Sequence, residues 1–237
     1  MGIFDGLVED DSIQEDTDFV GGFQVLDSGV YDATIDMAYV DKSSGGALNV
    51  NFVFKTQDGK ELKQTIYVSS GDKKGNLNYY IDKKGNKNFL TGYNLVKAIT
   101  LLTIGKELSA VDTEVKTLNI YDYTAKKEIP QKKEVIMELL GQDITLGVLK
   151  VIENKNTKNA QGIYVPSAET RTFNEVDKIF RTKDRLTVAE IKAEATEPGF
   201  INTWSEKNTG KVRDKSKAVS GGNSPTAAPA AKTSLFS

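Results

Sequence analysis

The chain has 237 residues, with 31 Lys and Arg against 33 Asp and Glu, and it contains no Cys and no His. The absence of Cys excludes disulfides, thiol nucleophiles and Cys-bound metals, and the absence of His excludes catalysis by an imidazole base. We therefore expect no cofactor and no metal site. No stretch approaches the roughly 18–20 apolar residues of a membrane span, so we expect a soluble, unsecreted protein without membrane contact.

Charge is distributed unevenly along the chain, although the net charge is only -2. Residues 1–18 contain seven acids and no base, whereas residues 205–237 contain six bases and two acids in a Ser/Ala/Pro-rich sequence. We predict a flexible acidic arm over 1–18, a folded domain over 19–204, and a basic disordered tail over 205–237. Such arms either bind partners or keep a protein soluble, and the composition leaves both readings open.

The first predicted elements form a meander of three strands. Apolar and polar residues alternate over 31–39 and over 48–54, which is the pattern of half-buried strands. Two Ser and two Gly at 43–46 predict the turn between them. The pair at 58–59, Asp then Gly, predicts a hairpin turn, after which a third strand runs over 62–68.

A helix is predicted after the meander. Leu95, Ile99 and Leu102 fall on one face at helical spacing. Gly92 precedes this face, and Gly105 follows it, at the position where a left-handed residue commonly ends a helix. The spacing therefore predicts one helix between these two glycines.

Strands are predicted again over 117–123, 134–140 and 144–152, with turns at 125–130 and 141–142. Three strands, a helix and further strands is the order of an OB-type barrel, in which the helix lies between the third and fourth strands. We therefore predict a mainly β protein with short helices, an OB-type five-stranded barrel with extended loops and disordered termini. Other small barrels and sandwiches share this order and stay open.

Two capping-box patterns predict short helices near the end of the domain. Thr172 and Glu175 have the spacing of one box, and Thr187 and Glu190 have the spacing of the other. Apolar residues follow both boxes. The second pattern is the stronger prediction.

The segment 69–93 combines five lysines with four aromatic residues, four glycines and four asparagines. Lysines neutralise phosphates, and aromatic rings stack on unpaired bases of any sequence, so the segment predicts contact with single-stranded nucleic acid. Alternatively, it is a solvated loop whose rings cap the barrel. The candidate contacts are Lys73, Lys74, Tyr79, Tyr80, Lys83, Lys84, Lys87 and Phe89.

A second basic cluster lies between residues 147 and 185, which hold eight bases and five acids. Residues 154–162 predict a flexible hairpin tip, and the long loops of OB barrels are where oligonucleotides bind. We predict that this cluster and the segment 69–93 form opposite walls of one groove. The candidate contacts are Lys150, Lys155, Lys158, Tyr164 and Arg171.

Short blocks spread over residues 20–217 resemble the single-stranded DNA-binding proteins of lytic tailed phages, in the podovirus group whose virion carries an RNA polymerase. The resemblance implies an OB-type fold that binds single-stranded DNA without sequence specificity. The blocks are Lys42–Ala47, Thr65–Val68, Leu90–Tyr93, Tyr121–Tyr123, Leu146–Leu149, Glu153–Asn156, Tyr164–Arg171 and Asn208–Lys215.

The resemblance also implies a biological setting. Such a protein protects single-stranded DNA during phage DNA replication, in the cytoplasm of the infected bacterial host, with roles in recombination and in transcription. It has replication proteins and RNA polymerase as partners. The family supplies no catalytic residue, so we expect that the protein is not an enzyme.

The two ends of the chain depart from a common pattern. Many single-stranded DNA-binding proteins end in an acidic tip that closes on Phe and binds partners, but here residues 232–237 carry no carboxylate. Leu235 and Phe236 are candidates for partner docking, and an apolar ending without function is the alternative. We hypothesise that the acidic arm 1–18 competes with DNA for the basic surface.

Two other functions remain open. Asp58, Glu61 and Lys63 could together hold a metal ion and activate water, as in a metal-dependent nuclease, although the turn predicted at Asp58 favours a structural role. The protein could also be a non-catalytic virion or scaffold component whose arms contact other proteins.

Overall fold

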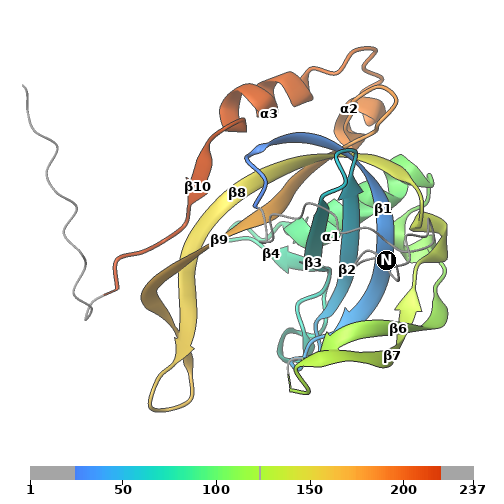
Figure 1. The fold of residues 1–237 in the computed structure, drawn as a ribbon. Helices are drawn as coiled ribbons and strands as arrows, with labels where there is room; N and C mark the ends of the chain where they lie inside the picture. The colour runs from blue at the N-terminus through green and yellow to red at the C-terminus, as the bar shows by residue number, and fades with distance from the viewer. Residues whose placement is uncertain (1–24, 123, 220–237) are drawn as a thin grey trace, which may run out of the picture.

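The computed structural model describes residues 25–122 and 124–219. The acidic arm 1–18 and the docking candidates Leu235 and Phe236 lie outside the described residues. Figure 1 shows a curved sheet from which one long two-stranded arm projects. Within the described ranges, no helix is long and apolar enough to cross a membrane.

The protein is mainly β with short helices, as predicted. The strands are β1 (Gly29–Lys42), β2 (Leu48–Thr56), β3 (Glu61–Tyr67), β4 (Tyr79–Ile81), β5 (Lys87–Phe89), β6 (Glu114–Asp122), β7 (Lys127–Val135), β8 (Asp143–Lys158), β9 (Tyr164–Phe180) and β10 (Val212–Asp214). The helices are α1 (Thr91–Thr103), α2 (Val188–Lys192) and α3 (Phe200–Asn208), with 3-10 turns η1 (Asp72–Lys74), η2 (Leu108–Ala110) and η3 (Met137–Leu139).

The described residues form one eight-stranded sheet and a separate two-stranded sheet of β4 and β5. In the large sheet the neighbours run β3, β2, β1, β8, with β9 on the far edge of β8. The β6–β7 hairpin joins through β7, which pairs with the end of β1. Strand β10 pairs with β8 in parallel.

The meander β1–β2–β3 is antiparallel, and both predicted turns are confirmed. In the first turn Gly46 has a left-handed φ of 81°. In the second, Gly59 has a φ of 79°, and the carboxylate of Asp58 accepts a hydrogen bond from the Thr56 hydroxyl. Both turns therefore depend on the backbone freedom of glycine.

Helix α1 confirms the predicted helix. Val96 and Ile99 are fully buried, and α1 packs against β3, β8 and β9. Gly92 lies in the first turn, where a Cβ atom would come within 2.1 Å of the carbonyl oxygen of Tyr67. Gly105 follows the helix with a left-handed φ of 70°. Gly92 thus allows the start of α1 to lie close to the backbone of Tyr67, and Gly105 allows the chain to change direction after the helix ends.

The strand predicted over 134–140 is wrong. Strand β7 ends at Val135, and residues 137–139 form η3, with Leu139 fully buried. Strand β7 instead begins at Lys127, inside the predicted turn 125–130. Its sequence is largely polar because it pairs with β6 in a mostly exposed hairpin, so its apolar pattern is weak.

Of the two capping-box predictions, one is wrong and one is confirmed. Thr172 and Glu175 lie within β9, where β-branched and aromatic neighbours pair with β8 and tertiary pairing overrides the local signal. Thr187 caps α2 in a complete capping box with Glu190.

Strands β8 and β9 are the longest and extend past the rest of the sheet. Residues 143–148 of β8 pair with β1, whereas residues 153–171 form a projecting two-stranded ribbon, here called the arm. Register shifts occur at Gly147/Val148 and at Asn154/Asn156, and such bulges bend strands. The arm therefore curves away from the body (Figure 1).

Residues 205–214, which we expected in a disordered tail, form the end of α3 and strand β10. Beyond β10, the amide of Lys215 donates to the carbonyl oxygen of Ile152 at 2.8 Å. Asn154 then holds Lys217 through two hydrogen bonds, at 2.7 and 3.1 Å. This part of the chain runs along the base of the arm.

The core has two parts. The larger lies between the meander, β8, β9 and α1, and its centre includes Phe52, Phe54 and Leu146. The smaller lies under α3, where Trp204 packs with Phe180 and two aliphatic residues of β8. The second part fixes α3 against the sheet.

Candidate nucleic-acid interface

The segment 69–93 is a folded hairpin rather than an open loop. Strands β4 and β5 pair, and Asp82 closes their turn by accepting hydrogen bonds from the backbone amides of Lys84 (2.8 Å) and Asn86 (2.9 Å). Hydrogen bonds, first of all those from Asn86, lower the pKa of the Asp82 carboxyl group. Gly85 provides the left-handed residue, with a φ of 86°.

The β4–β5 hairpin exposes a ring-bearing surface. Tyr80, Ile81 and Phe89 are 53%, 60% and 47% exposed. Phe89 also stacks on Tyr93 of α1, with the ring centroids 4.9 Å apart, so the hairpin is held against the helix. Rings fixed in this way lose little conformational freedom when a flat ligand stacks on them.

The five lysines of this segment have no ion-pair partner in the part of the chain that the structure describes. Lys73 and Lys74 lie in η1, Lys83 and Lys84 lie in the β4–β5 turn, and none of the five forms an ion pair with another described residue. Lys87 lies 5.0 Å from the centre of the Tyr79 ring. Their charges are therefore available to an external anion.

The lysines of η1 sit on a fixed support. The amide of Asp72 donates to the carbonyl oxygen of Gly45 at 2.9 Å, in the turn between β1 and β2. A Cβ atom on Gly46 would lie 2.1 Å from the Asp72 carboxylate, so the two loops are packed in contact. Lys73 and Lys74 thus project from a loop that the sheet holds in place.

The bases predicted as contacts in the second cluster, on and next to the arm, are mostly neutralised. Lys150 pairs with Asp27 at 2.9 Å, Lys155 with Glu169 at 3.1 Å, and Arg171 with Glu153 at 2.6 Å. Lys158 is the exception: it forms no ion pair with a described residue and lies 5.3 Å from the centre of the Tyr164 ring. The arm therefore offers a polyanion much less free charge than the β4–β5 hairpin does.

Phe89 joins the hairpin to a groove of about 570 Å³ between α1, α2 and β9. Lys97, Lys178 and Lys192 line this groove, with Phe200 at its far end. Lys97 lies 5.5 Å from the Phe89 ring centre and pairs with Glu107 at 2.8 Å. The predicted contacts of the second wall do not line this groove; the part of that wall that does line it is residues 177–179 of β9.

A second groove, of about 530 Å³, continues from the first under α3. Both grooves share Asp177, Lys178 and Phe200, and we call the two together the basic groove. Its lining holds six bases and one acid. The bases are Lys97, Lys178, Lys192, Lys207, Lys211 and Arg213, and the acid is Asp177.

Asp177 is the residue that organises the second half of the basic groove. It lies at the β8–β9 bulge, accepts a hydrogen bond from Nε1 of Trp204 at 2.7 Å, and pairs with Arg213 at 3.6 Å. Lys178 next to it lies 5.7 Å from the Phe200 ring centre. One carboxylate thus orients an indole and an arginine, while Lys178, Lys192, Lys207 and Lys211 form no ion pair with a described residue.

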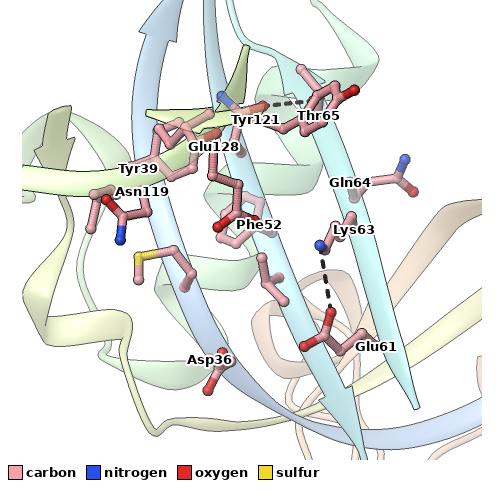
Figure 2. A pocket seen from close by; sticks show the side chains of 15 residues that line it. Asp36, Tyr39, Phe52, Glu61, Lys63, Gln64, Thr65, Asn119, Tyr121 and Glu128 are labelled. Carbon is pink, nitrogen blue, oxygen red and sulfur yellow. Dashed lines mark hydrogen bonds and ion pairs between the residues drawn. The ribbon is translucent and has the colours of Figure 1, made fainter. Parts of the chain in front are cut away.

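A third groove, of about 550 Å³, has the opposite charge. It lies between the outer face of β1–β2–β3 and the β6–β7 hairpin, and we call it the acidic groove. Figure 2 shows Glu128 of the hairpin side and Asp36 of β1 around its lining, with Glu61 and Lys63 joined by an ion pair of 3.6 Å. Three acids against one base line it, so it does not suit a polyanion.

The carboxylates considered for metal chemistry are dispersed. Asp58 pairs with Lys60 at 2.9 Å in the β2–β3 turn, whereas Glu61 and Lys63 lie further along on the outer face of β3. A hydrogen bond from Thr56 lowers the pKa of Asp58. Among the described residues, no group of three or more acidic side chains is arranged to hold a metal ion.

Several residues of the basic groove were missed by sequence reasoning. Lys207 lies in the last turn of α3 and Lys211 lies three residues beyond its end, a pattern that could have been read as a basic helix end. Lys178 and Phe200 meet only because the bulged β9 packs beside α3, and no local pattern reveals that contact.

Comparison with models of known protein families found no match, and comparison with curated proteins found none either.

Proposed function

We propose that the protein binds single-stranded DNA without sequence specificity, through the β4–β5 hairpin and the basic groove that continues from Phe89. The observation that carries this proposal is the hairpin surface, on which exposed rings lie among five lysines that form no ion pair with any described residue. Unpaired cations neutralise phosphates, and exposed rings stack on bases of any sequence. Double-stranded DNA keeps its bases stacked inside, so the rings favour a single strand.

The strand order supports an OB-type fold as part of the proposal. Five strands follow the order β3, β2, β1, β8, β9, and α1 comes between the third strand and β8. The side chain of Gln64 on β3 accepts a hydrogen bond from the amide of Val176 on β9 at 2.6 Å, across the gap that a barrel would close. OB-type domains commonly bind oligonucleotides.

The resemblance to phage proteins suggests where this activity acts. We propose that the protein coats single-stranded DNA during phage replication, with further roles in recombination and transcription. Leu235 and Phe236 are proposed to dock replication proteins and RNA polymerase.

Deleting residues 232–237 should then abolish the binding of these partner proteins and leave the affinity for DNA unchanged.

The decisive experiment is a titration of labelled oligo(dT) with the full-length protein, followed by anisotropy at several salt concentrations. We expect saturable binding that weakens steeply with salt, because phosphate neutralisation releases counterions. A duplex of equal length is the matched control and should bind more weakly.

The same titration separates the other functions. Adding Mg²⁺ and examining the oligonucleotide on a gel tests for a nuclease, and cleavage that is lost in Glu61→Gln would overturn the proposal. Failure to bind at low salt would favour a non-catalytic virion or scaffold protein instead.

A further inference from the structure

The tip of the arm, residues 158–164, carries two large exposed side chains, Ile163 and Tyr164, next to a polar turn. Ile163 and Tyr164 are 61% and 65% exposed. The turn itself is well formed, because the side chain of Asn159 accepts hydrogen bonds from the amides of Gln161 (3.0 Å) and Ile163 (2.9 Å). Large apolar side chains held out on a structured turn are suited to burial against a partner.

The tip is also positively charged. No acid occurs between Glu153 and Glu169, and Lys158 has no ion-pair partner among the described residues. A partner for the tip should therefore present both apolar surface and unpaired carboxylates.

The acidic groove presents both. Tyr39, Leu118 and Ile120 supply apolar lining, while Asp36 and Glu128 have no ion-pair partner among the described residues. Figure 2 shows the side chain of Glu128 reaching across the groove toward the sheet. The acidic groove has a volume of about 550 Å³, which is within the range of pockets that bury a few side chains.

The tip of the arm and the acidic groove of the same molecule lie far from each other. Figure 1 shows the arm and the β6–β7 hairpin on opposite sides of the body. Residues 153–158 of β8 extend the arm by roughly 20 Å at about 3.3 Å per residue. The arm is therefore placed to reach a neighbouring molecule rather than its own groove.

We propose that the tip of one molecule docks into the acidic groove of a second copy of this chain. Tyr164 and Ile163 fill the apolar part of the groove, and Lys158 meets Glu128 and Asp36. Because the two patches differ, each bound copy still offers a free tip or a free groove, and the contact builds an open row rather than a closed dimer.

Such a row has a direct consequence for DNA binding, and this step rests on the proposed function. Each molecule on a single strand places its tip next to the groove of the following molecule. Binding becomes cooperative, and the basic groove, on a different surface, stays available to the DNA. The tip residues Lys158 and Tyr164 then serve protein contact in place of the DNA contact that the sequence suggested.

The test measures self-association of the full-length protein without DNA, by sedimentation velocity over a range of concentrations. One variant changes the tip, Ile163→Ser with Tyr164→Ser, and one changes the groove, Glu128→Lys. Matched controls are Val115→Ser, an exposed apolar residue on β6 outside the groove, and Glu197→Lys, an exposed acid between α2 and α3. Each test variant should weaken association about tenfold or more, and the controls should not.

Two further measurements fix the geometry. A mixture of the tip variant and the groove variant should form one-to-one pairs but no longer rows, because only one intact tip and one intact groove can meet. Lys158→Glu alone should weaken association, and combining it with Glu128→Lys should restore it. Association that both test variants leave unchanged, or a wild-type protein that stays monomeric and binds long oligo(dT) without cooperativity, would overturn the proposal.

The two proposals fail in different ways. On an oligonucleotide that holds one molecule, the tip variant should bind with wild-type affinity, and on long oligo(dT) it should lose cooperativity. A loss of affinity for the short oligonucleotide would assign the tip to DNA and refute its docking role. Tip-dependent self-association in a protein that binds no DNA would retain the docking contact and refute the proposed function.

Discussion

Asp32 and Arg185 show how one residue pair fixes a turn that the backbone alone disfavours. Arg185 has a left-handed φ of 64°, which is costly for a residue with a side chain. Its guanidinium bonds to the carboxylate of Asp32, in one contact at 2.7 Å, and to the hydroxyl of Thr145. Thr145 in turn donates to Asp32 at 2.6 Å. The turn after β9 is thereby tied to β1 and β8.

This network predicts a pH dependence of stability. The hydrogen bond from Arg185 lowers the pKa of Asp32 in the folded protein, against the opposing effect of burial. The stabilisation is therefore complete above the unfolded pKa of about 3.9 and is lost as pH falls through the lower folded value. Asp32→Asn should lower the free energy of unfolding by about 1–3 kcal/mol at pH 7, and the deficit should shrink below about pH 4. Urea unfolding of both proteins across pH 3–7 measures this difference in the free energy of unfolding. A difference that stays constant with pH would contradict the prediction.

Tyr80 is the residue whose proposed role is easiest to isolate, because it is exposed and supports no core packing. Tyr80→Ala should weaken binding to oligo(dT) by about 1–3 kcal/mol if its ring stacks on a base. Tyr67→Ala, on the outer face of β3 and equally exposed, is the matched control. Equal affinities for the two variants would make the hairpin rings structural.

At the scale of the element, Gly147 and Trp204 determine how α3 lies on the sheet. A Cβ atom on Gly147 would come within 3.1 Å of the Trp204 ring and 3.2 Å of the Cβ of Lys178. The missing side chain of Gly147 leaves the space that the indole fills, opposite the bulge at Asp177 in β9. Helix α3 therefore packs on a strand position that tolerates no side chain.

Gly147→Ala should lower the free energy of unfolding by about 1–3 kcal/mol, because the methyl group overpacks the contact with Trp204. Urea unfolding followed by circular dichroism gives the change. Gly45→Ala is the control, since the space around it is open apart from the Ser43 hydroxyl at 3.9 Å, and it should change stability little. A Gly147→Ala protein as stable as wild type would mean that α3 shifts without cost.

The elements predicted from sequence are those with a strong local signal. The meander, α1 and the cap at Thr187 combine periodicity with glycine or capping residues, so each could be read within one window. The false helix at Thr172 and the missed start of β7 have the opposite cause. Their conformation depends on the partner strands β8 and β6, which are distant or unrecognised in the sequence.

The candidate site likewise has a part that the sequence predicted and a part that it could not predict. The lysines and rings of 69–93 were predicted because they are consecutive in sequence. The ion pairs that neutralise Lys155 and Arg171 join strands across the arm, so sequence could not reveal them. The basic groove needs β9, α1, α2 and α3 together, and only the fold assembles it.

At the scale of the whole molecule, the described residues separate charge between surfaces. Bases predominate on the β4–β5 hairpin and along the basic groove, and acids predominate in the acidic groove. A net charge near zero therefore hides two surfaces with opposite preferences. This sorting predicts which bases set the salt dependence of DNA binding.

Replacing Lys83 and Lys84 by Ser should lower the slope of log K against log salt concentration by about 0.7 for each phosphate that is no longer neutralised. Replacing Lys155 and Arg171 by Ser should leave the slope nearly unchanged, because their charges are already paired with Glu169 and Glu153. Titrations of a short oligo(dT) at four salt concentrations give both slopes. The opposite pattern would move the DNA path to the arm.

Trp204 gives the basic groove an optical property of its own. It is the sole tryptophan of the sequence, and its indole donates to Asp177, which also pairs with Arg213. An anion that draws Arg213 away from Asp177 changes the electric field at the indole and hence its emission. Fluorescence excited at a wavelength that tryptophan alone absorbs would therefore report occupancy of this groove, without any label.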